Sequence, residues 1–200
     1  MKKIKRSQEF QCKDLVTWYR TNSNTDYDRE KQTNNSNVKN LIRNSLLLMQ
    51  NNLCAYTEML ITDAAEIDHW NPKLKHTDGY EFSNLFAVHS APNKTKSNLT
   101  PPIHLKPDEG DYSPEKYLDY DIIKDLFIPK NDLNDEFKIV IQNEIDILGI
   151  NSILSTRKSR LGSVKSFANV SKIKGLTLEV LFQTFPDFPT AKKFFLSKFN

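Results

Sequence analysis

The feature that most constrains the fold is a series of short apolar segments, separated by turn residues, within residues 54–98. Residues 66–70 and 84–89 have the length and composition of strands, and an Asp-Gly turn signal lies between them, so they predict a hairpin. Ser90 follows as a potential helix cap, and Pro92 would occupy the first helical turn, where its missing N–H is tolerated. The pattern therefore predicts a strand–turn–strand–helix unit.

Helical periodicity dominates the chain outside this unit. Residues 38–50 carry apolar side chains at helical spacing, with Ser36 or Asn37 in position to cap them. Residues 133–148 repeat the pattern, and Gly149 provides a C-terminal stop. These two segments predict amphipathic helices.

The remaining segments predict further helices joined by an irregular connection. Residues 101–117 are rich in Pro and predict a surface connection. Asn151 can cap a helix after it, and residues 176–185 and 190–199 predict two more short helices. Together with the hairpin unit, these elements predict an α+β fold in which a small ββα core is embedded in a mainly helical chain.

The same pattern suggests three regions that pack as one compact unit. Residues 1–53 form an N-terminal helical segment, residues 54–100 the ββα core, and residues 101–200 the Pro-rich connection and C-terminal helices. No run approaches the roughly 18 apolar residues that span a bilayer, and the basic start lacks an apolar stretch behind it. We expect a cytoplasmic protein without a membrane partner.

Charge is unevenly distributed although the net charge is only +3. Residues 107–146 carry twelve acids against four lysines, whereas residues 156–200 carry nine bases against two acids. A basic end can attract a phosphate backbone, although a solvated helix face is the commoner reason for such charge. The acidic segment can equally be a docking surface for a basic partner.

Asp68 and His69 are adjacent titratable groups in a predicted strand, which calls for a chemical explanation. A carboxylate oxygen suits a hard cation such as Mg²⁺, and an imidazole can take a proton from water near neutral pH. Asn93 would add a neutral oxygen ligand at the start of the following helix. Alone, an Asp-His pair is more often structural, and Asn84 and Asn93 are ordinary turn and cap residues; their joint order favours phosphodiester hydrolysis.

The segments AEIDHWNPK, SNLFAVH and APNKTKSN resemble the HNH nuclease motif, which has the ββα-metal fold. The flanking segments LLLMQNNLCAYTE and NEIDILGINSILSTRKSRL resemble a narrower group, the PtuB-like HNH proteins encoded beside an ATPase in Septu-type and some retron anti-phage systems. The resemblance covers most of the chain. The HNH motif carries more specificity than the flanking patterns do.

The resemblance implies a role for each matching residue. His69 would be the general base, Asp68 and Asn93 would hold a catalytic Mg²⁺ or Mn²⁺, and Asn84 would pin the loop that orients His69 through hydrogen bonds to the backbone. Lys96 matches the helix lysine of the family and would contact phosphate. Nucleic-acid contacts are expected from three lysines: Lys73, Lys94 and Lys96.

The sequence departs from relatives that carry a structural zinc on two Cys-x-x-Cys pairs. The first pair is replaced by Cys54 and Thr57, and the second by His89 and Pro92. Two potential ligands do not make a closed tetrahedral site, so we predict no structural zinc. We expect Cys54 to be a small buried residue and His89 to pack or form a hydrogen bond.

These observations predict a metal-dependent HNH endonuclease, the effector of an anti-phage system. By resemblance its partner would be an ABC/SMC-like (PtuA-like) ATPase, and its substrate DNA or a structured RNA such as tRNA. Arg157 or Arg160 would reach the site if the C-terminal helices fold back over it. The alternatives are a catalytically inactive module that docks nucleic acid or the ATPase, and a standalone restriction-type HNH enzyme.

Overall fold

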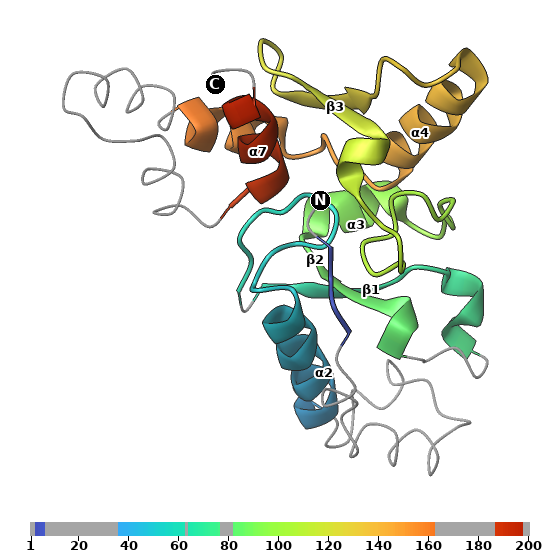
Figure 1. Ribbon diagram of the computed structural model, residues 1–200. Helices are drawn as coiled ribbons and strands as arrows, with labels where there is room; N and C mark the ends of the chain where they lie inside the picture. The colour runs from blue at the N-terminus through green and yellow to red at the C-terminus, as the bar shows by residue number, and fades with distance from the viewer. Residues whose placement is uncertain (1–2, 7–35, 63, 77–81, 163–186, 198–200) are drawn as a thin grey trace, which may run out of the picture.

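The computed structural model describes residues 3–6, 36–62, 64–76, 82–162 and 187–197. The described part is α+β, with helices around two small antiparallel sheets of two strands each. In Figure 1 the central helix α3 lies between the first hairpin and the C-terminal elements. No helix of the described residues is long and apolar enough to cross a membrane.

Helix α2 (Ser36–Met49) confirms the helix predicted from apolar spacing. Its inward face buries Ile42 and Leu46 against strand β2 of the first hairpin. The chain then turns sharply through Asn51 and Asn52, which have φ values of 54° and 58°. Asn tolerates this left-handed region better than most side chains do, which explains why the helix ends there. The predicted cap side chains, Ser36 and Asn37, lie outside the described side chains.

The first hairpin pairs β1 (Glu66–His69) with β2 (Leu85–Val88) in antiparallel register, His69 opposite Leu85. All four β2 residues are buried, so the outer edge of β2 must satisfy its backbone groups inside the protein. The Gln50 side chain does this by accepting from the Ala87 N–H (2.9 Å) and donating to the Ala87 carbonyl (2.7 Å). Both predicted strands are confirmed, each slightly shorter than its sequence pattern.

Two 3-10 turns connect the strands, η3 (Pro72–His76) and η4 (Phe82–Asn84). The predicted Asp-Gly turn between them lies outside the described residues. Helix α3 (Ser90–Lys96) follows β2 directly. His89, rather than the predicted Ser90, caps it: the His89 Nδ1 atom accepts from the Ala91 N–H at 3.2 Å.

The sequence analysis missed a second hairpin in the C-terminal half. Strand β3 (Leu118–Asp121) pairs antiparallel with β4 (Leu126–Pro129) after a short 3-10 turn, η5 (Pro114–Lys116). Asn151 closes the outer edge of β4, accepting from the Phe127 N–H (3.1 Å) and donating to its carbonyl (2.9 Å). The predicted capping role of Asn151 is therefore wrong, because its amide is used by β4.

The helical predictions for the C-terminal half are largely confirmed. Helix α4 (Asp135–Ile147) begins after the Asn134 cap, and Gly149 ends it with a φ of 58°. Another helix begins at residue 154 and is described to residue 162, and α7 (Pro189–Ser197) matches the last predicted helix. The helix predicted at 176–185 lies outside the described residues.

One hydrophobic core joins these elements. It contains Leu46 of α2, Phe86 of β2, Ile145 of α4 and Ala191 of α7, each no more than 1% exposed. Trp70 packs edge-on against Phe86, with 5.9 Å between the ring centroids, so it is a core residue directly beside the first hairpin.

Candidate functional site

The candidate site is formed where β1 packs against α3. Side chains two apart on a strand share a face, as do side chains three apart on a helix. Glu66 and Asp68 of β1 accordingly meet Asn93 and Lys96 of α3. The Asn93 Nδ2 atom donates to Glu66 at 2.6 Å, and the Lys96 ammonium lies 3.0 Å from Asp68.

Asp68 is a buried carboxylate with partners on both oxygens. Its Oδ2 atom accepts from the Tyr56 hydroxyl at 2.5 Å, and its Oδ1 atom accepts from Lys96 at 3.2 Å. Burial raises the pKa of Asp68, while Lys96 and the Tyr56 hydroxyl oppose that rise. Burial and the Asp68 charge raise the pKa of Tyr56 well above its ordinary value, so Tyr56 remains a hydrogen-bond donor.

Lys96 lies in a different environment from the one expected. Its side chain is 0% exposed, and its ammonium also donates to the His69 carbonyl at 2.6 Å. A phosphate on the surface cannot reach this group, so the burial of Lys96 argues against the phosphate contact predicted from the sequence. The sequence suggested a phosphate contact because nothing in the local pattern shows that the Asp68 carboxylate and the His69 carbonyl bind this lysine.

Asn84 makes the backbone hydrogen bonds expected of it. Its Oδ1 atom accepts from the Asn71 N–H at 2.8 Å, and its Nδ2 atom donates to the Asn71 carbonyl at 3.1 Å. The Asn84 carbonyl also accepts from the Trp70 N–H at 2.8 Å. Three hydrogen bonds thus fix the two residues that follow His69, and with them the end of β1.

His69 is the last residue of β1 and is 6% exposed. Because side chains alternate along a strand, its imidazole points to the face opposite Asp68. The two neighbours are linked through the His69 backbone, since Lys96 bridges the Asp68 carboxylate and the His69 carbonyl. An imidazole held in this way has the chemistry of a general base.

The predicted metal ligands, Asp68 and Asn93, do not fit a divalent cation in this arrangement. Asp68 is already neutralised by Lys96, and an ammonium 3.0 Å from the carboxylate would repel a second cation. Asn93 is bound to the carboxylate of Glu66. Among the described residues, no group of three or more His, Cys, Asp or Glu side chains could hold a metal ion.

Two residues of this cluster were missed in the sequence. Glu66 stands two positions before Asp68, so strand alternation alone would have placed it on the same face. Tyr56 lies twelve residues upstream of Asp68 in an irregular segment, and no periodic signal points to it.

Two of the four positions compared with zinc cysteines, Cys54 and Thr57, lie in a loop over residues 53–60, whereas His89 and Pro92 lie at the start of α3. Cys54 is buried, and its Sγ atom accepts from the His89 N–H at 3.3 Å, so His89 forms hydrogen bonds as expected. Burial raises the pKa of the Cys54 thiol, which keeps it protonated. The backbone bridge between Leu53 and Leu60 closes the loop, while the absence of zinc remains a prediction.

The C-terminal segment braces this loop from outside. The buried Glu58 carboxylate accepts from the Thr190 N–H (2.8 Å) and hydroxyl (2.6 Å) in the first turn of α7. Asp187 accepts from the Leu60 N–H at 2.5 Å, and the Phe188 N–H donates to the Glu58 carbonyl at 3.0 Å. A carboxylate at a helix N-terminus complements the helix dipole as well as the free N–H groups.

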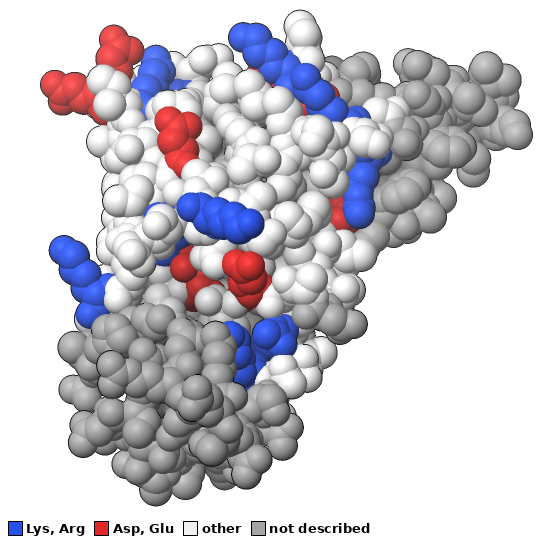
Figure 2. Space-filling view, turned by 180° about the vertical axis from the view of Figure 1, so that it is seen from behind, with Lys and Arg blue, Asp and Glu red and all other residues white. Residues whose placement is uncertain are grey.

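The cationic residues proposed for nucleic-acid contact divide into exposed and buried ones. Lys73 and Lys94 are exposed. Arg157 is fully buried among backbone carbonyls, and Arg160 pairs with Asp187, so neither contacts the Asp68 cluster in this structure. On the face shown in Figure 2, acidic and basic side chains are interspersed rather than gathered into one patch.

The acidic segment is largely paired within the chain. Asp108 pairs with Arg6 and Lys106, and Glu115 with Lys193. Other acids in the segment also have partners in the same chain: Glu109, Asp111, Asp119, Asp121, Asp132, Asp135, Glu144 and Asp146. These contacts favour a structural role for the acids over a docking surface.

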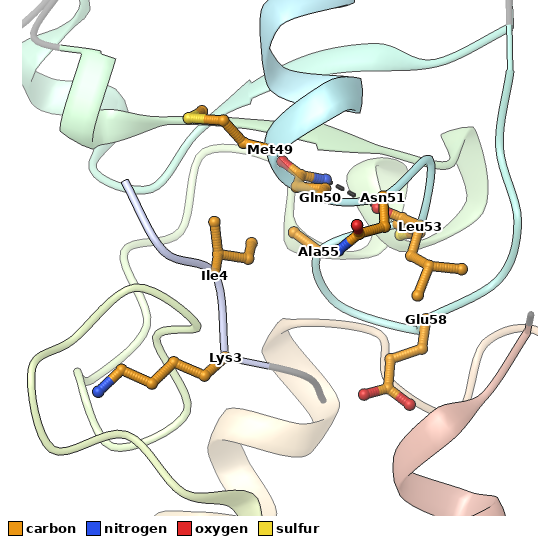
Figure 3. A pocket seen from close by; sticks show the side chains of 9 residues that line it. Lys3, Ile4, Met49, Gln50, Asn51, Leu53, Ala55 and Glu58 are labelled. Carbon is orange, nitrogen blue, oxygen red and sulfur yellow. Dashed lines mark hydrogen bonds between the residues drawn. The ribbon is translucent and has the colours of Figure 1, made fainter. Parts of the chain in front are cut away.

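A small pocket lies apart from the Asp68 cluster. Figure 3 shows it between the N-terminal Lys3 and Ile4, the end of α2 around Gln50, and the 53–60 loop with Glu58. It has space for about one water molecule, which is too little for a substrate.

Comparison with known proteins adds no relative to this description. A scan against protein-family models finds no match, and a search of curated proteins finds none either. A functional assignment therefore depends on the residues and the geometry described above.

Proposed function

We propose that this chain is an HNH-type endonuclease that hydrolyses phosphodiester bonds of nucleic acid. The observation that carries the proposal is the strand–strand–helix unit: His69 ends β1, Asn84 holds the residues after it, and α3 packs Asn93 against the same strand. An Asp-His pair held by a hairpin and a helix is more than a solvated surface pair.

In this proposal His69, Asn84 and the two exposed lysines have separate roles. His69 takes a proton from the attacking water, and the Asn84 hydrogen bonds to Asn71 limit movement of the chain beyond His69. The exposed Lys73 and Lys94 would attract the phosphate backbone. We retain Mg²⁺ or Mn²⁺ as the proposed cofactor, but because Asp68 is bound by Lys96 we assign the metal neither a ligand set nor a step.

The proposed context is anti-phage defence in the cytoplasm, with an ABC/SMC-like ATPase as partner. This part rests on the resemblance of the flanking segments to the PtuB-like group. A nuclease that cuts without sequence readout endangers its own cell, so control by a partner has a physical purpose. Contacts to phosphate carry no base information, so DNA and structured RNA such as tRNA both remain substrates of the proposal.

The experiment is cleavage of plasmid DNA and of tRNA with Mg²⁺ or Mn²⁺, with EDTA as the metal-free control. We expect the wild type to cut at least one substrate and His69→Ala to lose at least about a hundredfold in rate. Lys158→Met, which alters an exposed lysine outside the hairpin unit, is the matched control. Absence of cleavage with the partner ATPase present would reject the enzyme proposal.

A second candidate is a non-catalytic HNH-like module that docks nucleic acid or the ATPase. The occupied Asp68 carboxylate favours it, because a working metal ligand would need free oxygens. In that case His69→Ala leaves binding unchanged, and a mobility-shift assay detects a complex that EDTA does not dissolve. A standalone restriction-type enzyme is a third candidate, and co-purification of a large ATPase would count against it.

A further inference from the structure

Lys96 is a lysine with a buried side chain, and such burial requires a physical explanation. Its side chain is 0% exposed, which makes it one of the largest fully buried side chains in the described part of the protein. An ammonium removed from water requires a countercharge and hydrogen-bond acceptors. The Asp68 carboxylate supplies the charge at 3.0 Å, and the His69 carbonyl supplies a short hydrogen bond of 2.6 Å.

The other side of the Asp68 carboxylate is equally fixed. The Tyr56 hydroxyl donates to Oδ2 at 2.5 Å, and Tyr56 is itself fully buried from a different segment of the chain. Tyr56, Asp68 and Lys96 therefore form a line of three buried side chains that ends on the His69 carbonyl. Lys96 joins this line to the backbone of His69, because its ammonium donates both to Asp68 and to that carbonyl.

Helix α3, which carries Lys96, packs closely against the end of α4. A Cβ atom placed on Gly149 would lie 2.9 Å from Pro92 Cα and 3.0 Å from Thr95 Cβ, so the end of α4 touches α3 closely. Ser97 follows the last residue of α3 and has a φ of 49°. Its N–H donates to the Asn93 carbonyl at 2.9 Å and ends the helix. These contacts hold α3, which carries Lys96, against the end of α4.

We propose that Lys96 is the internal counter-cation of Asp68 and a positioning residue for His69, and that it does not contact phosphate. The Tyr56–Asp68–Lys96 line fixes the end of β1, so the imidazole of His69 is aimed by contacts made through its own carbonyl. The role in cleavage rests on the proposed nuclease function, whereas the pairing and its effect on His69 do not.

The test combines four proteins: wild type, Lys96→Met, Asp68→Asn and the double variant. Met keeps the length of the lysine stem without its charge. We expect the double variant to have a higher urea midpoint than Lys96→Met, because it removes both charges together. Additive effects of the two substitutions would show that the two groups do not act as a pair and would overturn the proposal.

A second measurement follows His69 without any activity. In protein labelled with ¹⁵N-histidine at one fixed pH, we expect Lys96→Met to shift the ring signals of His69. Those of His104, which lies against Tyr117 and Phe137, should stay in place. Unchanged His69 signals would overturn the positioning role. If Lys96→Met does not fold, the double variant carries the same comparison.

Kinetics separate positioning from phosphate binding. We expect Lys96→Met to lower kcat at least tenfold and to change KM for nucleic acid by less than twofold, whereas Lys94→Met raises KM. A raised KM with unchanged kcat in Lys96→Met would restore the phosphate contact and overturn the proposal. If the wild type cuts nothing, the nuclease function fails, and the midpoints and ring signals still decide the pairing and its effect on His69.

Discussion

The β1–β2 and β3–β4 hairpins each pair two strands of four residues, and each leaves the outer edge of its second strand to a side-chain amide. Gln50 covers β2 at Ala87, and Asn151 covers β4 at Phe127. Each hairpin also packs near a buried cation. The two hairpins differ in what surrounds that cation.

Lys96 at the first hairpin faces a carboxylate, Asp68. Arg157 at the second donates to the carbonyls of Asp125 (3.1 Å) and Ile150 and to the Asn151 amide oxygen (3.1 Å). Its guanidinium also lies 4.9 Å from the Phe127 ring centroid. The first hairpin thus holds a lysine in direct contact with a carboxylate, whereas the direct acceptors of Arg157 are carbonyl and amide oxygens, with the charges of Asp125 and Glu58 nearby. The first arrangement suits a site, and the second suits a scaffold.

The largest expected effect on stability is at Arg157, the buried cation of the second hairpin. Arg157→Met removes the donor for three buried oxygens, none of which can be neutralised by a proton, so we expect a loss of about 4 kcal/mol in the free energy of unfolding. Urea unfolding followed by circular dichroism measures it, with the exposed Lys158→Met as control, expected within about 0.5 kcal/mol. A loss near that of the control would remove the contrast between the hairpins.

The next largest effect on stability is at Lys96, the buried cation of the first hairpin, and it depends on pH. Lys96→Met leaves Asp68 buried without its cation, and we expect a loss of about 3 kcal/mol at pH 7. Burial already raises the pKa of Asp68, and removing Lys96 raises it further. A group whose pKa is higher in the folded state stabilises at low pH and loses that contribution as pH rises, so the loss should be smaller at pH 5 than at pH 7. Arg157→Met should recover less on acidification, because the direct acceptors of Arg157 are carbonyl and amide oxygens that do not take up a proton in this range.

The two hairpins share a feature that we call an amide clasp: the side-chain amide of Gln50 or Asn151, bound to the backbone of the second strand. Gln50→Ala removes the acceptor of the Ala87 N–H, while the Ala87 carbonyl still accepts from the Ala55 N–H; Asn151→Ala uncovers both the N–H and the carbonyl of Phe127. We expect each variant to lose about 2 kcal/mol. Amide hydrogen exchange should quicken at Ala87 in the first variant and at Phe127 in the second. Asn143→Ala, at an exposed position of α4, is the control. Exchange that quickens throughout the chain, rather than locally, would contradict the clasp interpretation.

The smallest effect is at the surface, where Glu115 pairs with Lys193 of α7. Partial burial disfavours the charge, but hydrogen bonds from Lys193, the backbone and Ser113 prevail, and the pKa of Glu115 falls to about 2. A group whose pKa is lower in the folded state stabilises the protein at pH values above its unfolded pKa. This contribution is lost as the pH falls toward the folded pKa. Glu115→Gln should therefore lose less than about 1 kcal/mol at pH 7, because the pair is exposed, and nothing near pH 2. Equal losses at both pH values would show that the charge is not responsible.

The sequence predicted the parts of this comparison that local periodicity determines. Helices α2 and α4 followed from apolar spacing, and the first hairpin from two short apolar strands. The hydrogen bonds of Asn84 were also anticipated. The second hairpin was missed although the buried Leu118 and Tyr120 alternate with half-buried acids, because four residues in a Pro-rich, acidic stretch give a weak signal.

The environment of the buried cations could not be predicted. Lys96 meets Asp68 across 28 positions of sequence, and Arg157 meets the Asp125 carbonyl across 32. Nothing in a helical pattern distinguishes a lysine that faces solvent from one that faces a distant carboxylate. Tyr56 was missed for the same reason, since it meets Asp68 only through tertiary packing. Glu66 could have been placed beside Asp68 by strand alternation, but its partner Asn93 is defined by the packing of α3 on β1.

The brace between Glu58 and Thr190 has a consequence for the order in which the protein is made. Its hydrogen bonds join positions 132 residues apart, so a ribosome must synthesise the start of α7 before Glu58 of the 53–60 loop can be braced. That loop also donates from the Ala55 N–H to the Ala87 carbonyl of β2, next to the site. Contacts at such separation form late in folding. A nascent chain without α7 would thus lack the brace on the loop beside the first hairpin, and we expect that loop to reach its final packing only after synthesis has passed residue 190.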